Sequence, residues 1–179
     1  MIETLVAVVI LSLGLIEVLS LQTSALKFTR DARLQSVAVR FGRELSEMMR
    51  TNAQLAAQAN NPYLRAFSGD SRALEPPQSC LDSGKSCASP TDVAHAQMTD
   101  WLERVASALP GARVTVCADS SPYDADGLPV WDCTAPPAAE HGITYIKIGW
   151  TREDGRGNVV TASHAAARPF VVFPVALDS

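Results

Sequence analysis

The chain has 179 residues, a formal net charge of −4 and 47% hydrophobic residues. This length accommodates one domain and an additional segment, but not two full domains. The acidic balance argues against a general binder of nucleic acid or of anionic membrane surfaces. The apolar content suits a small packed core together with one membrane-inserting segment.

The chain begins with its most apolar stretch. Between Leu5 and Ile16 there is no charged residue, whereas Glu3 precedes this run and Glu17 ends it. A helix needs about 20 apolar residues to cross a bilayer core, so the run is slightly short of a full span. No basic residue precedes it, which argues against a secretory signal peptide, and a plain membrane anchor stays open as an alternative.

An apolar stripe continues beyond this run into a charged and polar segment. Its members recur every three or four residues and therefore share one helical face. They are Leu34, Val37, Ala38, Phe41, Leu45, Met48 and Met49. With no proline before Pro62, the sequence predicts one helix from near Glu3 to about Ala59, roughly 80–85 Å long. We divide the chain into a transmembrane helix (1–25), its amphipathic continuation (26–60) and a globular part (61–179).

The globular part is predicted to be α+β. Residues 62–89 have a loop composition, and Ser89, Pro90 and Asp92 then form an N-capping pattern for a second helix that stops at Pro110. Alternating apolar residues predict strands over residues 113–118 and 143–150, and two further strand candidates are 158–162 and 170–175. Three or four antiparallel strands would pack against the stripe of the long helix.

The four cysteines form two locally spaced pairs, Cys80 with Cys87 and Cys117 with Cys133. Because they follow a membrane segment, we expect export to an oxidising compartment and two disulfides. A zinc site is the alternative, but the gaps are longer than those of a zinc knuckle.

The sequence contains no motif that indicates an enzyme. Three scattered histidines, His95, His141 and His164, belong to no metalloprotease or nucleophile-elbow pattern. Asp124 and Asp126 before Gly127 are candidate calcium ligands, but the later ligands of a calcium loop are missing. An acidic hairpin tip is the alternative. We therefore predict neither a catalytic residue, nor a metal, nor a cofactor.

Two parts of the sequence resemble the type IV pilin superfamily. Its members start with a leader that ends in glycine, followed by Phe-Thr-Leu-Ile-Glu and an apolar helix, and Met1-Ile2-Glu3 is similar to the end of that motif. Further along, Asp100-Trp101, the Ala108–Gly111 segment and the Ile146–Trp150 strand resemble the PilV branch of minor pilins.

The resemblance implies the type IV pilin fold and a structural role. A prepilin peptidase would process the chain, and its new N-terminus would be methylated. It would be stored as a single-pass protein in the inner membrane and then join the major pilin and other minor pilins in an extracellular pilus. There it would prime assembly at the tip and present a tip adhesin. Alternatives are a pseudopilin of a type II secretion system or a membrane-anchored periplasmic enzyme.

The resemblance gives a role to one site residue, and the sequence itself suggests others. Glu3 would neutralise the N-terminal amine of a neighbouring subunit during assembly, whereas the pattern gives no role to Glu17. Basic residues after the apolar run form either a solvated helix face or a contact with lipid headgroups or subunits. In the globular part, Tyr123 and Trp131 are candidate partner-binding anchors, because aromatic residues dominate interface hot spots. Alternatively, both rings pack on their own loops.

Overall fold

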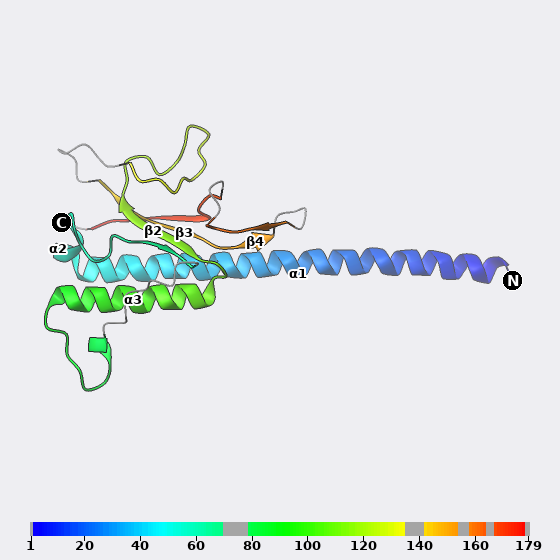
Figure 1. Ribbon diagram of the computed structural model, residues 1–179. Coiled ribbons are helices and arrows are strands. Elements are labelled where there is room, and N and C mark those ends of the chain that lie inside the picture. The colour runs from blue at the N-terminus through cyan, green and yellow to red at the C-terminus, as the bar shows by residue number, and fades with distance from the viewer. Residues whose placement is uncertain (1, 70–78, 135–141, 154–157, 164–166, 178–179) are drawn as a thin grey trace. The chain divides into compact units, whose positions relative to one another are not determined.

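The computed structural model describes residues 2–69, 79–134, 142–153, 158–163 and 167–177 (Figure 1). The chain divides into two compact units, Met1–Leu34 and Gln35–Ser179. The helix α1 (Ile2–Thr51) supplies all of the described first unit and continues into the second. The second unit contains the other helices and both sheets. The fold class is α+β, as predicted.

Helix α1 ends earlier than the sequence predicts. It stops at Thr51, and a single further turn, α2 (Ala53–Ala56), follows. Asn52 between them leaves helical geometry, with φ −118° and ψ 41°. Its side-chain amide donates back to the Met48 carbonyl oxygen at 3.2 Å and to the Tyr63 hydroxyl at 2.9 Å. The predicted end near Ala59 is therefore wrong, because these side-chain hydrogen bonds compete with continued helix.

The apolar stripe of α1 is confirmed as part of the core. Ala38, Phe41, Leu45 and Met49 are at most 5% exposed. Phe41 contacts the ring of Trp101 edge to face at 6.0 Å, and its carbonyl oxygen accepts a hydrogen bond from the Trp101 indole N–H at 3.2 Å. This contact joins α1 to α3 (Pro90–Ala108).

The start of α3 matches its predicted capping pattern. The Ser89 hydroxyl accepts a hydrogen bond from the Asp92 backbone N–H at 3.2 Å and donates one to the Asp92 carboxylate at 2.8 Å. Pro90 occupies the first turn, where no N–H is needed. The helix buries Ala94, Met98 and Trp101 among the apolar residues of its inner face.

The main sheet is antiparallel with strand order β1-β2-β3-β6. Its strands are β1 (Ala66–Ser68), β2 (Arg113–Ala118), β3 (Thr144–Gly149) and β6 (Val171–Val175). The pairing of Val114 with Ile148 and of Val116 with Ile146 places buried side chains on one face. That face packs on α1, where the Phe173 side chain of β6 lies beside Gly42.

Strands β1 and β5 differ from the sequence-based expectations. Strand β1 lies inside the segment 62–89 that the sequence predicts to be a loop, and its three residues are too few for a detectable alternation. The third predicted strand is shorter than expected: β5 (Val159–Val160) pairs with the unpredicted β4 (Arg152–Glu153) in a separate two-stranded sheet. The short 3-10 helix η1 (Ser79–Leu81) completes the elements. Most of the predicted turn over 153–158 lies outside the described residues.

Candidate functional site

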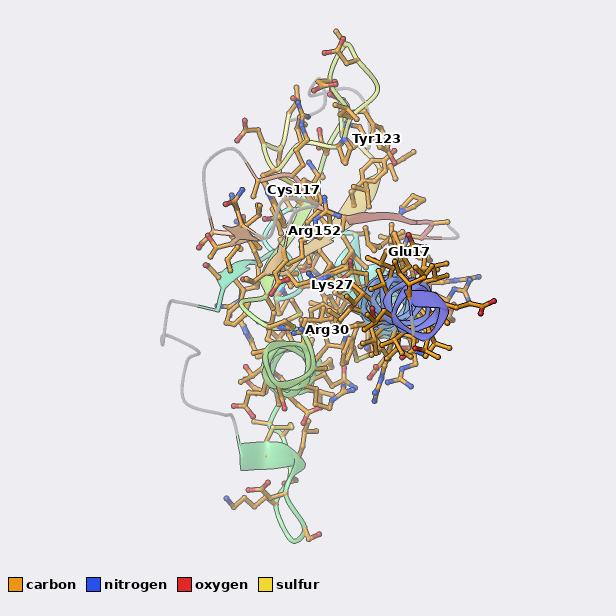
Figure 2. All side chains as sticks on the ribbon, turned by 90° about the vertical axis from the view of Figure 1, so that its right-hand side faces the viewer. Glu17, Lys27, Arg30, Cys117, Tyr123 and Arg152 are labelled. Atoms are coloured by element: carbon orange, nitrogen blue, oxygen red, sulfur yellow. A yellow bond between two sulfur atoms is a disulfide. The ribbon has the colours of Figure 1, made fainter. Side chains whose placement is uncertain are left out.

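The first unit is an exposed apolar helix. Every described side chain from Ile2 to Arg33 is exposed, and the large apolar residues among them include Leu5, Ile10 and Leu15 at 62–67% exposure. The side chains radiate from the helix axis in all directions (Figure 2). The helix is long and apolar enough to cross a membrane. Burying such a surface releases about 25 cal/mol per Å², so the segment needs lipid or protein around it.

The charged residues of this helix occupy defined positions. Glu3 lies in the first turn, where a negative charge interacts favourably with the helix dipole. Glu17 is exposed within the apolar stretch, and Lys27, Arg30 and Arg33 are exposed beyond it. A carboxylate in hydrocarbon is costly unless a cation or hydrogen-bond donors accompany it. Because Glu3 and Glu17 are both exposed, other chains that pack on the helix can reach them.

In the second unit, the outer face of the sheet is covered by a loop of residues 119–134, which we call the covering loop. Trp131 of this loop is 8% exposed and lies directly over Gly149 of β3, where the Cβ atom of any other residue would come within 2.8 Å of the indole ring. The Arg113 guanidinium stacks on the ring at 4.3 Å from its centroid. Burial lowers the pKa of Arg113. Trp131 thus attaches the covering loop to the sheet.

The burial of Trp131 changes the prediction for one of the two candidate partner-binding anchors. Trp131 does not present its ring to a partner, because the ring packs on its own domain. Tyr123 is 46% exposed and keeps the properties that an interface anchor needs. The sequence did not separate the two residues, since both lie in a polar loop between the same cysteines.

A buried ion pair fixes the same loop. Lys147 of β3 and Asp119 at the start of the covering loop have side chains with no exposed surface, and the Lys147 ammonium contacts the Asp119 carboxylate at 2.5 Å. The ammonium also donates to the Asp132 carbonyl oxygen at 2.7 Å. Asp119 further accepts hydrogen bonds from the backbone N–H groups of Ser121 and Thr134. Burial opposes ionisation of Asp119, but these donors together lower its pKa.

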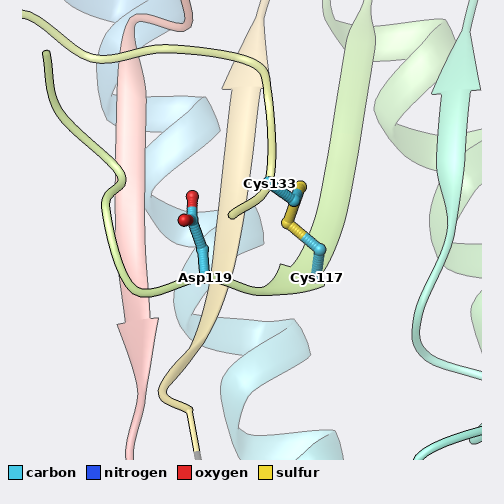
Figure 3. Close-up of side chains that lie close together, drawn as sticks. All are labelled: Cys117, Asp119 and Cys133. Atoms are coloured by element: carbon cyan, nitrogen blue, oxygen red, sulfur yellow. A yellow bond between two sulfur atoms is a disulfide. The ribbon is translucent and has the colours of Figure 1, made fainter. Parts of the chain in front are cut away.

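Asp119 also lies beside two cysteine sulfurs, an arrangement that suggests a metal site (Figure 3). The sulfurs of Cys117 and Cys133 are bonded to one another, so neither is a thiolate that could bind a metal. The carboxylate of Asp119 is engaged by Lys147 and two backbone N–H groups. This cluster therefore closes a loop and does not hold an ion.

The acidic tip of the covering loop is a hairpin whose aspartate makes internal hydrogen bonds. One oxygen of Asp124 accepts from the backbone N–H groups of Asp126 and Leu128, and the other pairs with Arg168 at 2.6 Å. The Leu128 N–H, followed by the Arg168 contact, lowers the pKa of Asp124. These bonds occupy the candidate calcium ligand and agree with the alternative interpretation of a turn. The tip exposes Tyr123 and Leu128, at 46% and 47%.

Both expected disulfides are present, Cys80–Cys87 and Cys117–Cys133. The second joins the end of β2 to the end of the covering loop, so it closes the loop that Asp119 and Trp131 hold against the sheet. Of the three histidines, His95 alone lies in the described part of the chain, with its Nδ1 atom 3.1 Å from an Arg65 nitrogen.

We expect the double substitution Cys117→Ser and Cys133→Ser to lower the free energy of unfolding by about 3 kcal/mol, from the entropy of closing a loop of this length. The corresponding change at Cys80 and Cys87 opens a shorter loop and is expected to cost about 2.5 kcal/mol. Non-reducing peptide mapping of the wild-type chain checks the pairing. Free thiols or a Cys80–Cys117 link would contradict it.

Comparison of the chain with protein-family models, with curated proteins and with solved structures found no match.

Proposed function

We propose that the chain is a pilin-like structural subunit, a minor pilin of the PilV branch, that assembles through its N-terminal helix into a type IV pilus. The observation that carries this proposal is the dual character of α1. One continuous helix is apolar and fully exposed over its described residues up to Arg33, and farther along it supplies Phe41, Leu45 and Met49 to the core of an α+β domain. A plain membrane anchor does not require the second property.

The exposed apolar surface of α1 and its continuation into the core support two stages of the same function. In the inner membrane, after cleavage by a prepilin peptidase, lipid covers the apolar helix. In the filament, the helices of the major pilin and of other minor pilins replace that lipid. Because the helix continues into the core of the second unit, it carries the globular domain with it from one setting to the other.

The globular domain would distinguish this subunit from its neighbours. The hairpin tip with Tyr123 and Leu128 is its exposed apolar feature in the covering loop, and Asp124 and Arg168 hold the tip in one conformation. A rigid exposed aromatic residue binds with little loss of conformational entropy. We propose that this tip contacts another minor pilin or an adhesin at the end of the filament.

The proposal is tested by the substitution Glu3→Ala in cells that assemble the filament. We expect the variant to enter the membrane normally and to fall about tenfold or more in sheared filaments, because the charge of a neighbouring subunit's N-terminus loses its partner. Immunoblots of membrane and filament fractions measure both quantities.

The matched control is Ser12→Ala, which removes an exposed polar group from the same helix. The Ser12 hydroxyl donates to the Val9 carbonyl oxygen within the helix, and its loss removes no charge, so we expect the control to enter membranes and filaments like the wild-type chain. Equal amounts of Glu3→Ala and wild-type protein in the filaments would rule out the assembly role of Glu3.

A further inference from the structure

Three basic residues follow the apolar run of α1 and form what we call the basic side of the helix. Lys27, Arg30 and Arg33 are exposed and stand three residues apart. At 3.6 residues per turn, each is turned by about 60° from the one before, so the three lie within about 120° of one another around the helix axis. The acid in this stretch, Asp31, is turned by about 100° from Arg30. Positive charge therefore dominates one side of the helix just beyond its apolar part.

The position of the basic side along the helix matches the surface of a bilayer. With Glu3 at one edge of the hydrocarbon core, about 20 helical residues cross the core and bring the chain to Thr23. Lys27 then lies about 6 Å beyond the hydrocarbon along the helix axis, and Arg30 about 10 Å. The headgroup layer on each side of the core is about 5–7 Å thick. The first two basic residues therefore begin at the depth of the lipid phosphates or just outside it.

The side chains of these residues lean toward the bilayer. In an α-helix each Cα–Cβ bond is tilted toward the N-terminus, which is here the membrane side. Long basic side chains can therefore reach the phosphate groups while their Cα atoms remain outside the hydrocarbon. Leu26 and Phe28, at 71% and 76% exposure, add apolar surface at the same depth. Apolar and basic side chains at one level are typical of helices that bind a lipid surface.

The charge of the basic side distinguishes anionic from zwitterionic lipids. Each basic residue close to an anionic membrane surface raises the affinity about fivefold, because the surface carries excess negative charge. The net charge of −4 of the whole chain does not oppose this contact. Physiological salt screens charges over about 8 Å, so the acidic residues of the distant globular part have little effect at the bilayer surface.

We infer that the basic side of α1 binds the phosphate groups of anionic phospholipids, such as phosphatidylglycerol, in the leaflet from which the chain continues into its second unit. Lys27 and Arg30 contact the headgroups, and Arg33, about 15 Å beyond the hydrocarbon, adds a weaker attraction. This contact fixes how deeply the helix sits in the membrane. The inference rests on the membrane-inserted helix of the proposed function.

The test uses the full chain reconstituted into phosphatidylcholine vesicles that contain a small amount of spin-labelled phosphatidylglycerol or spin-labelled phosphatidylcholine. Electron paramagnetic resonance measures the fraction of each labelled lipid that the protein immobilises. We expect phosphatidylglycerol to be favoured about fivefold or more over phosphatidylcholine by the wild-type chain. The triple substitution Lys27→Gln, Arg30→Gln and Arg33→Gln should make the two lipids nearly equal. Glutamine has a similar helix propensity, so the helix is kept.

Two further variants control for overall charge. The substitutions Arg50→Gln, Lys85→Gln and Arg152→Gln together remove the same number of positive charges from exposed positions of the second unit, and we expect them to leave the lipid preference unchanged. Asp31→Asn removes the acid beside the basic side and should strengthen the preference for phosphatidylglycerol. High salt should weaken the preference in every chain that shows it.

Several results would overturn the inference. They are equal immobilisation of both lipids by the wild-type chain, an unchanged preference in the triple variant of the basic side, or an equal loss in the triple variant of the second unit. A triple variant of the basic side that keeps its lipid preference but is depleted from sheared filaments would assign these residues to contacts with other subunits instead. Alkaline carbonate extraction separates this failure from that of the proposed function. Protein that stays in the membrane without a lipid preference contradicts the lipid contact alone, whereas protein released from it contradicts the membrane role.

Discussion

Replacing Asp119 by alanine is expected to lower the free energy of unfolding of the second unit by about 3–5 kcal/mol. The substitution leaves the Lys147 ammonium fully buried beside one remaining acceptor, the Asp132 carbonyl oxygen. It also removes the acceptor of the Ser121 and Thr134 backbone N–H groups, which hold the two ends of the covering loop. Urea unfolding of the full chain in detergent, followed by tryptophan fluorescence, measures the change.

Two control variants separate the effect of the buried charge on stability from the effect of the lost hydrogen bonds. The double substitution Asp119→Asn with Lys147→Met removes both charges and keeps an acceptor for the two backbone N–H groups, so we expect it to recover most of the lost stability. Glu47→Ala breaks an exposed pair with Arg50 and is expected to change stability by less than about 0.5 kcal/mol. A double variant that is no more stable than Asp119→Ala would show that the ion pair does not carry the effect.

The same pair predicts how stability depends on pH. The pKa of Asp119 is lower in the folded state than in the unfolded chain, so the unfolded chain binds its proton first as the pH falls. The contribution of ionised Asp119 to the free energy of unfolding is therefore complete above the ordinary carboxyl pKa of about 4. It is lost as the pH falls through the lower pKa of the folded state. Urea midpoints measured from pH 6 downwards should fall less steeply for Asp119→Asn than for the wild-type chain.

Trp131→Ala is expected to destabilise the second unit by about 3–5 kcal/mol, because it empties the space over Gly149 and removes the stacking partner of Arg113. Tyr123→Ala, in the same loop, is expected to change stability by less than about 0.5 kcal/mol, since the ring is largely exposed. Urea unfolding monitored by tryptophan fluorescence compares the two variants, since both keep Trp101 and Trp150.

Under the proposed function, Tyr123→Ala should weaken the binding of partner subunits although it leaves stability nearly unchanged. Folded Tyr123→Ala protein should bind other minor pilins about tenfold or more weakly, as expected for an aromatic anchor. Binding to detergent-solubilised minor pilins, measured by surface plasmon resonance, tests this. Normal binding by folded Tyr123→Ala protein would place the recognition surface elsewhere, and an unchanged stability of Trp131→Ala would contradict its role in holding the loop.

Elements with a strong local signal were predictable from the sequence. Helix α1 follows from its apolar run and stripe, α3 from the cap at Ser89, and β2 and β3 from alternating apolar residues. The local spacing of the cysteines likewise indicated both disulfide pairs. In these cases, the pattern that indicates the element lies within a short stretch of the chain, even where its partner is farther away.

The break at Asn52 and the strand β1 were not predictable in this way. Asn52 leaves the helix while donating to Tyr63, eleven residues farther on, and such a partner is not visible from helix propensity. Strand β1 pairs with residues 113–115 of β2 and contains three residues, so its existence depends on a neighbour about fifty residues away.

The sequence by itself determined the exposed apolar helix, its charge pattern and the α+β class, because these depend on composition and on short-range periodicity. The tertiary structure decided the chemistry of the sheet's outer face. By strand alternation, Lys147 would point to solvent opposite Ile146 and Ile148, yet the covering loop buries it with Asp119. The same loop buries Trp131 and leaves Tyr123 exposed, since burial depends on which distant segment covers a face and not on the residue's own neighbours.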